Sequence, residues 1–383
     1  MPRTIVIKVG TSTLADADGC IDQAFLSQLS AQLCDLMDEG RRVVLVTSGA
    51  VRAGAELLQW KGRPRTVPMK QAAAAVGQGR LMGLYAAAFA ARGRVVGQVL
   101  LTRQLAQERA RYVNAQNTLT TLLSHGALPI VNENDTVAVE EIQFGDNDTL
   151  AALVAALVGA KLLVLLTNVE GLLDAERKVV PRVPAITDEV RALAGGAGRH
   201  GSGGMTTKLQ AAEIAGAAGV RTVIAPGRRP NVITDIVRGE ALGTLFLPPA
   251  RRLRGRKHWL AYGTQPCGSI TVNACARRVL VEEHRSLLPS GVVAVQGAFA
   301  SGEAVSLRSE EGEEFARGLA SCDWRDAQRL MGVHTAAVAG ILGRSGVDEI
   351  VHRDNLVVLA SSGQPGAEPQ DEEEYVEHPY SGA

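Results

Sequence analysis

The chain has 383 residues, a length that predicts two or three domains. Hydrophobic residues make up 46% and charged residues 21%, a globular composition in which 40 basic and 40 acidic residues cancel, so overall charge implies no polyanionic partner. The five cysteines show neither C-x-x-C nor paired spacing, which argues against a secreted disulfide scaffold and against a zinc knuckle.

The first 245 residues alternate short β-branched runs with longer Ala- and Leu-rich stretches. Strands that are almost continuously apolar and alternate with helices predict a three-layer α/β/α sandwich, in which helices cover both faces of a mainly parallel sheet. We expect strands at 4–9, 42–47, 95–101, 128–132, 161–167 and 222–225. We expect helices at 23–39, 70–91, 114–125, 148–159 and 206–218.

Two features argue against a membrane or secreted protein. The longest apolar run, 150–166, is interrupted by Gly159 and Lys161, so it predicts a buried helix and a buried strand rather than a membrane span. A strand-like run begins within five residues of the N-terminus and leaves no room for a signal peptide. We therefore expect a cytoplasmic protein that does not contact the membrane.

A second domain is predicted after a basic linker. Five of the seven residues 251–257 are basic, which is typical of a solvated linker and less often of an anion contact. Short strands at 269–272, 291–296 and 304–307, with a helix at 324–331, predict a small β-rich domain. The expected division is a first domain at 1–250, a linker at 251–267, a second domain at 268–355 and an acidic, disordered tail at 356–383.

Charge is distributed unevenly along the chain. Residues 266–360 carry nine arginines against twelve acidic residues, and residues 361–383 carry six acidic residues and no base. In a chain of zero net charge, residues 1–265 therefore carry about +9, the sign that suits a domain handling anions. The acidic second domain makes a nucleic-acid partner unlikely, because RNA-binding proteins present basic surfaces.

Neither common nucleotide-binding loop is present. There is no G-x-x-x-x-G-K-[ST], and the glycines of 77–83 have the wrong spacing for a dinucleotide fingerprint. Instead, two predicted strands end in small-residue turns, at 10–12 and 47–50. Such a turn lets backbone N–H groups bind an anion at the start of the next helix. The backbone expected to contact phosphate is that of Gly10, Thr11, Gly49 and Ala50.

Further segments could carry chemistry. Lys8 lies inside a predicted buried strand, so its ammonium either reaches solvent at the sheet edge or is aimed at phosphate oxygens. Segments 132–135 and 145–148 place amides and carboxylates at strand or helix ends, where turns and N-caps are the commoner explanation. The glycine-rich segment 201–208 opens a helix and is either a flexible connection or a phosphate cradle that ends in a second lysine.

Taken together, these segments resemble the amino-acid kinase family, and the resemblance covers about residues 3–355. Residues 268–355 resemble the PUA domain, a small β-rich barrel that some members append. The resemblance is strongest to members that use ATP to phosphorylate the side-chain carboxylate of L-glutamate at the start of proline biosynthesis. The motifs that carry it are residues 8–12, 46–50, 131–135, 144–148, 166–168 and 203–208.

The resemblance implies that Lys8 and Lys208 stabilise the transferring phosphoryl group and that Asp148 orients both lysines. It also implies that Mg²⁺ accompanies ATP, with no protein ligand of the metal assigned. One departure is Asn168, where the family commonly has Asp. The residues expected to hold glutamate are Ser48, Asp135 and Asn147, with Asp135 facing the α-ammonium. The residues expected to line the ATP site are Lys8, Thr167, Asn168, Ser202, Gly203, Gly204, Met205, Thr206, Thr207 and Lys208.

The chemistry implied by the resemblance agrees with the residue types. A carboxylate acceptor is already ionised at pH 7, so the reaction needs no general base, and the motifs contain no histidine. The resemblance further implies a homo-oligomer, a dimer or tetramer, and feedback inhibition by proline. Transient contact with glutamyl-phosphate reductase is one hypothesis for the acidic tail. The alternatives are another acceptor (acetylglutamate, aspartate or carbamate) and an RNA-binding second domain.

Overall fold

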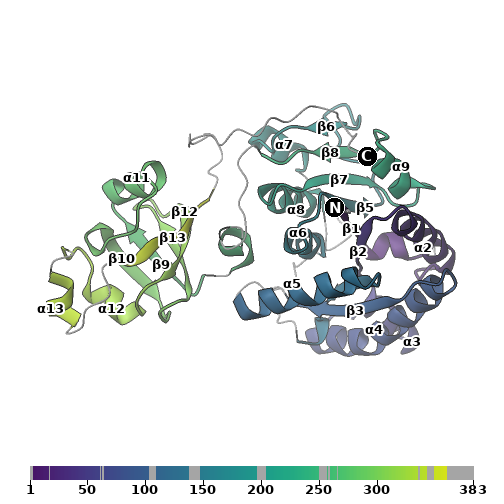
Figure 1. Cartoon of the computed structure of the whole chain (residues 1–383), viewed down its shortest axis with the longest axis horizontal. Helices are drawn as coiled ribbons and strands as arrows, with labels where there is room; N and C mark the ends of the chain where they lie inside the picture. The colour runs from purple at the N-terminus through teal and green to yellow at the C-terminus, as the bar shows by residue number, and fades with distance from the viewer. Residues whose placement is uncertain are drawn as a thin grey trace. The chain divides into compact units, whose positions relative to one another are not determined.

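The computed structural model in Figure 1 divides into two compact units near residue 252, and each unit is described by itself. In the part of the chain that the structure describes, no helix is long and apolar enough to cross a membrane. The described residues are 3–16, 18–60, 62, 64–102, 109–137, 147–195, 204–249, 257, 259–264, 266–334, 337–342 and 349–359.

An eight-stranded sheet forms the centre of the first unit, in the order β3-β4-β2-β1-β5-β7-β8-β6. Each neighbouring pair is parallel except β7 and β8, so the prediction of a mainly parallel sheet is confirmed. The strands are β1 (Thr4–Val9), β2 (Arg42–Val46), β3 (Val96–Leu101), β4 (Leu128–Glu133), β5 (Leu162–Thr167), β6 (Arg182–Val183), β7 (Arg221–Pro226) and β8 (Thr244–Phe246).

Helices cover both faces of this sheet, which confirms the three-layer prediction (Figure 1). Alternate side chains of β1 serve the two layers, because successive residues of a strand point to opposite faces. Ile5, Ile7 and Val9 join a core with α2, α4 and α9, whereas Lys8 faces α6 and α8. The helices are α1 (Thr11–Leu14), α2 (Gln23–Asp38), α3 (Ala50–Leu57), α4 (Val67–Ala90), α5 (Arg109–Ser124), the 3₁₀ helix η2 (Asp135–Val137), α6 (Asn147–Leu157), α7 (Asp188–Leu193), α8 (Met205–Ala217) and α9 (Val232–Arg238).

Helix α4 begins three residues before its predicted start. The Thr66 hydroxyl accepts a hydrogen bond from the Met69 backbone N–H at 3.4 Å, which caps the helix. Pro68 is tolerated in this first turn, because the first backbone N–H groups of a helix have no partner within it. The proline therefore lies inside the first turn of α4, and the helix begins before it, at Val67.

Helices α3 and α4 touch backbone to backbone through two glycines. A Cβ at Gly54 would lie 1.7 Å from the Ala73 carbonyl oxygen, and a Cβ at Gly77 would lie 1.9 Å from the Ala50 carbonyl oxygen. Any larger residue at either position would push the helices apart. This contact fixes the start of α3 against α4 and so places the turn that follows β2.

The second unit is built on a five-stranded sheet in the order β10-β9-β11-β12-β13, with a core of its own. A bridge between Leu287 and Val351 joins the segment before β10 to β13, at the far end of the sheet. The elements are the π-helix η4 (Trp259–Gly263), β9 (Gly268–Val272), α11 (Ala274–Glu282), the 3₁₀ helix η5 (Pro289–Gly291), β10 (Val292–Gly297), β11 (Ala304–Arg308), β12 (Glu314–Ala320), α12 (Trp324–Arg329), α13 (Val338–Leu342) and β13 (Val351–Val358).

The second unit differs from expectation at its ends. Strand β13 continues past the predicted end of the domain at residue 355, because Leu356 and Val357 are buried in the sheet. The Arg317 guanidinium donates to the carbonyl oxygens of Ala261 and Thr264, both at 3.0 Å, and ties η4 to β12. The basic residues 251–256 and the acidic tail from residue 360 lie outside the described residues.

Candidate active site

The carboxyl ends of four neighbouring strands carry the predicted site residues. Strands β1, β2 and β5 end at Val9, Val46 and Thr167, and β4 ends at Glu133. Parallel strands bring these ends to one edge of the sheet, where ligands of open α/β sheets bind. Helix α6 begins at the same edge, where Asn147 contacts Thr47 and Asp148 contacts Lys8, and Lys208 near the start of α8 reaches Asp148.

Lys8, Asp148 and Lys208 meet in one buried ion cluster. The Lys8 Nζ lies 2.6 Å from Asp148 Oδ1, and the Lys208 Nζ lies 3.0 Å from Asp148 Oδ2. Asp148 is fully buried, while Lys8 and Lys208 are 4% and 7% exposed, so Lys8 does not reach solvent at the sheet edge. Buried charges persist only when they are paired, and here two ammonium groups share one carboxylate. The cluster therefore carries a net charge of +1.

Gly10 and the first turn of α8 lie next to the ion cluster. A Cβ at residue 10 would touch the Lys8 Nζ at 3.4 Å, so Gly10 keeps that side of the ammonium free of side chain. On the other side, the Thr207 hydroxyl lies 3.4 Å from Asp148 Oδ2 and donates to the Gly204 carbonyl oxygen at 2.8 Å. The first turn of α8 therefore reaches the same cluster as the end of β1.

Asn147 joins the ion cluster to the turn after β2. Its Nδ2 donates to the Ser48 hydroxyl at 2.7 Å, to the Thr47 carbonyl oxygen at 2.8 Å and to Asn132 Oδ1 at 3.1 Å. The turn itself requires glycine, because Gly49 has a φ of +105°, in the left-handed region. Ser48 and Asn147, both predicted to hold substrate, are thus in direct contact, one residue away from Asp148.

Two residues of α4 without an assigned role in the sequence interpretation contact residues next to the site, and only the first of them contacts an amide. Gln78 Oε1 accepts from Asn132 Nδ2 at 2.9 Å, and the Tyr85 hydroxyl lies 2.7 Å from Thr47 Oγ1. Burial raises the pKa of the Tyr85 phenol, which therefore stays protonated. Asn132 lies in the motif at 131–135, which was a usable signal. Gln78 and Tyr85 lie within an apolar helix, and nothing local in the sequence points to them.

Asp135 opens the one-turn helix η2, which packs against α4. Burial raises the pKa of this carboxyl group to about 6, from an ordinary value of 3.8. None of the described cations forms an ion pair with it, so its negative charge is not compensated within that part of the chain. A ligand ammonium would supply the missing counterion and lower the pKa again.

The residues predicted to line the nucleotide site are only partly described. Thr167 is nearly buried at the end of β5 and donates to the exposed Asn168 side chain at 3.3 Å. Gly204 precedes α8, and Met205, Thr206 and Thr207 form its first turn with Lys208 directly after them. Ser202 and Gly203 lie outside the described residues, as do residues 144–146 of the fourth motif.

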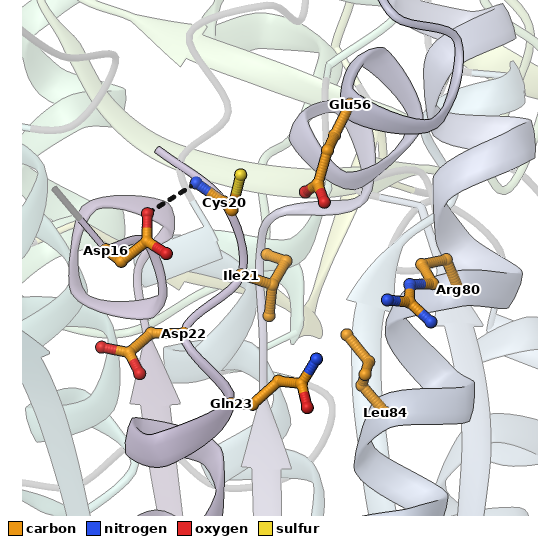
Figure 2. A pocket seen from close by; sticks show the side chains of 8 residues that line it. All are labelled: Asp16, Cys20, Ile21, Asp22, Gln23, Glu56, Arg80 and Leu84. Carbon is orange, nitrogen blue, oxygen red and sulfur yellow. Dashed lines mark hydrogen bonds between the residues drawn. The ribbon is translucent and has the colours of Figure 1, made fainter. Parts of the chain in front are cut away.

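A cavity of about 340 Å³ lies between Asp16, residues 20–23 and helices α3 and α4 (Figure 2). None of the predicted site residues lines it. The Glu56 carboxylate is the main cause of a raised pKa at the Cys20 thiol in this cavity. A raised pKa leaves less of the reactive thiolate, so Cys20 is a poor nucleophile. Within the described ranges, no three His, Cys, Asp or Glu side chains gather closely enough to hold a metal ion.

Comparison with known proteins identifies the family. The chain matches the amino acid kinase family over residues 3–226 and the PUA domain over residues 268–342. It is 50% identical to a glutamate 5-kinase of Moorella thermoacetica, over 93% of this chain and 96% of that protein. It is 46% identical to a glutamate 5-kinase of Syntrophotalea carbinolica, over 93% of this chain and 97% of that protein.

Among solved structures, the chain was matched to a Giardia carbamate kinase, at 17% identity and a TM-score of 0.46 over 65% of this chain and 99% of that one. Another is the N-acetylglutamate synthase from Neisseria gonorrhoeae, at 19% identity and a TM-score of 0.49 over 65% of this chain and 60% of that one. The family match extends over more than half of the sequence. The chain therefore belongs to the amino acid kinase family and carries a PUA domain after its kinase domain.

Proposed function

We propose that this chain transfers the γ-phosphoryl group of ATP to the side-chain carboxylate of L-glutamate, which gives L-glutamyl 5-phosphate, the first step of proline biosynthesis. The observation that carries the proposal is the buried Lys8–Asp148–Lys208 cluster beside the Asn147–Ser48 pair. The high identity to relatives named glutamate 5-kinase, over nearly their whole length, supports glutamate as the acceptor.

The cluster suits phosphoryl transfer because this reaction depends on positioning and on charge stabilisation. Lys8 and Lys208 hold the oxygens of the migrating phosphoryl group, and the Asp148 carboxylate keeps both ammonium groups directed at it. The cluster's excess positive charge offsets the negative charge that accumulates when one anion attacks another. The backbone of Gly10, Thr11, Gly49 and Ala50 approaches the same phosphate.

The acceptor is recognised through both of its ends. Asp135 binds the α-ammonium, and its uncompensated charge favours that partner. The Ser48 hydroxyl faces a carboxylate, whereas the Nδ2 of Asn147 is occupied by protein acceptors and leaves its oxygen for the substrate. Asn147 Oδ1 is buried and has no hydrogen-bond donor among the described residues, so it offers the ammonium a second acceptor. The attacking carboxylate has an ordinary pKa of about 4.3, so it is ionised at pH 7 and needs no base.

The nucleotide lies against the end of β5 and the start of α8. Thr167, Asn168 and residues 202–208 line its site. The Asn168 amide can both donate and accept hydrogen bonds, whereas a carboxylate at this position could only accept them. Mg²⁺ would be bound mainly by phosphate oxygens and waters, and it would supply further positive charge to the phosphates. Among the described residues, the one buried carboxylate of the site, Asp148, is already paired with two lysines, so no protein ligand of the metal is assigned.

Three further properties belong to the proposal. Proline shares an ammonium and a carboxylate with glutamate, so it competes for Asp135 and Asn147 and inhibits the enzyme. The protein acts in the cytoplasm as a homo-oligomer. The acidic tail makes transient contact with glutamyl-phosphate reductase, which consumes the labile product.

The test is ADP release with L-glutamate, aspartate, acetylglutamate or carbamate as the acceptor, with and without proline. Hydroxylamine in the same assay converts an acyl phosphate into a hydroxamate, which identifies the product. We expect turnover and hydroxamate with glutamate, and inhibition by proline. Higher kcat/KM for any other acceptor, or ADP release without hydroxamate, would refute the proposed reaction.

A further inference from the structure

Four polar side chains, from three different elements and the turn after β2, form a continuous hydrogen-bonded row. Gln78 on α4 accepts from Asn132 Nδ2 on β4 at 2.9 Å. Asn132 Oδ1 accepts from Asn147 Nδ2 on α6 at 3.1 Å, and Asn147 Nδ2 also donates to the Ser48 hydroxyl at 2.7 Å. We call these residues, Gln78, Asn132, Asn147 and Ser48, the amide row.

The direction of the row is fixed at Asn132, which is 2% exposed. Its Oδ1 also accepts from the Glu133 backbone N–H at 2.9 Å, so this oxygen serves two donors. Turning the amide over would place its NH₂ group against the NH₂ of Asn147 and against that N–H, donor against donor. Asn132 Nδ2 must therefore point to Gln78, where it needs an acceptor.

Gln78 supplies that acceptor with its Oε1. Its Nε2 is buried and has no hydrogen-bond partner among the described residues, so the contact that this amide makes there is the one through Oε1. Without Oε1, the buried Asn132 Nδ2 would lack an acceptor, and leaving such a group unpaired is costly. Asn132 would then shift toward another acceptor and withdraw the oxygen that orients Asn147.

We propose that Gln78 is a positioning residue for the acceptor side of the active site. It acts through Asn132, and its effect is to hold Asn147 Nδ2 against the Ser48 hydroxyl and the Thr47 carbonyl oxygen. The inference rests on the proposed function, because it assigns Ser48 and Asn147 to the substrate. The nucleotide side lies on β5 and α8, beyond the row, so the loss of Gln78 affects recognition of glutamate and not of ATP.

The alternative is that Gln78 only packs α4 against its neighbours, since the adjacent Gly77 touches Ala50. Tyr85→Phe is the matched control for this alternative. Tyr85 lies two turns further along the same helix and is fully buried, and its hydroxyl contacts Thr47 Oγ1. Its loss removes a polar contact between α4 and the end of β2 but leaves the amide row complete.

The experiment is a double-mutant cycle on the full chain with Gln78→Met, Ser48→Ala and the double variant, in which kcat and the KM for glutamate and for ATP are measured. Methionine keeps the length of the side chain and removes the acceptor, and Gln78→Leu is the second variant should the first not fold. We expect Gln78→Met to raise the KM for glutamate about tenfold and the KM for ATP less than about twofold.

Gln78→Met should lose most of its effect when Ser48→Ala has already interrupted the amide row. We expect Gln78→Met to raise the glutamate KM less than about threefold in the Ser48→Ala background, because the row then no longer positions a Ser48 hydroxyl against the substrate. Equal effects in both backgrounds, an unchanged glutamate KM, or a similar rise in Tyr85→Phe would overturn the assignment. Absence of wild-type turnover with glutamate would instead refute the proposed function, and the same cycle would be run with the acceptor that the wild type does phosphorylate.

Discussion

Replacing Asp135 by asparagine should strengthen the fold and weaken the enzyme. Burial raises the pKa of this carboxyl group from 3.8 to about 6. At this group the folded protein therefore binds more protons than the unfolded chain between those pH values. The contribution of Asp135 to the free energy of unfolding thus falls as the pH rises from about 4 to about 6 and is constant above. Full ionisation costs the folded state about 3 kcal/mol, from 1.36 kcal/mol per pH unit of difference.

A neutral amide at this position carries no such cost. Without ligand, we expect Asp135→Asn to raise the free energy of unfolding by up to about 3 kcal/mol at pH 7.5, and the gain should disappear near pH 4. The measurement is urea unfolding of both proteins at the two pH values, with and without about 20 mM glutamate. This concentration is above the KM of most enzymes and should saturate the site.

The same substitution removes the proposed partner of the substrate ammonium. We expect the KM for glutamate to rise at least about 100-fold, since breaking a buried charge contact costs several kcal/mol. Glutamate should stabilise the wild type and not Asp135→Asn. A stability gain that is independent of pH, or a destabilised variant with an unchanged KM, would show that the buried charge is not the cause.

Three other changes test the site and its support. Lys8→Ala and Lys208→Ala should each lower kcat about 10²–10³-fold. Arginine at either position should not restore kcat, because a planar guanidinium does not replace a compact ammonium. Near-normal turnover in any of these variants would contradict the proposed stabilisation of the phosphoryl group by the two lysines. Asp148→Asn should lower the free energy of unfolding by about 3–5 kcal/mol in urea, because two buried ammonium groups lose their counterion, and a loss below about 1 kcal/mol would mean that water or a neighbour compensates. Gly77→Ala should lower the free energy of unfolding by about 1–3 kcal/mol or more, because the added Cβ meets the Ala50 carbonyl oxygen. Gly83→Ala, at an open position of the same helix, should leave the free energy of unfolding unchanged or raise it by about 0.5–1 kcal/mol. Equal effects at both positions would refute the close contact.

The central strands could be predicted because burial on both faces leaves a simple signal. The run of β1 is apolar apart from Thr4 and Lys8, and its predicted bounds match the structure. Strands β6 and β8 were missed because they have two and three residues and form only by pairing with strands distant in the sequence. Strand β12 was missed because Arg317 interrupts its pattern, and its guanidinium serves the carbonyl groups of η4.

Some site residues can likewise be recognised from the local sequence, whereas others are found only from contacts between distant parts of the chain. Lys8 stands out because a lysine in a buried strand needs a reason, and the residue type alone points to chemistry. Its partner Asp148 lies 140 positions along the chain, and no local pattern in the sequence joins the two. Gln78 gives no signal at all, because a single glutamine in an Ala-rich helix is compatible with many environments. Only the fold shows which amide it faces.

The shared carboxylate of Asp148 has a consequence for the catalytic cycle. When the nucleotide leaves, neither amine is stranded in a dry interior, because each keeps its counterion, so the empty enzyme retains its working arrangement. If the two lysines bind phosphate as proposed, each incoming phosphate would compete with that carboxylate for both amines. This competition would weaken nucleotide binding and speed the release of ADP.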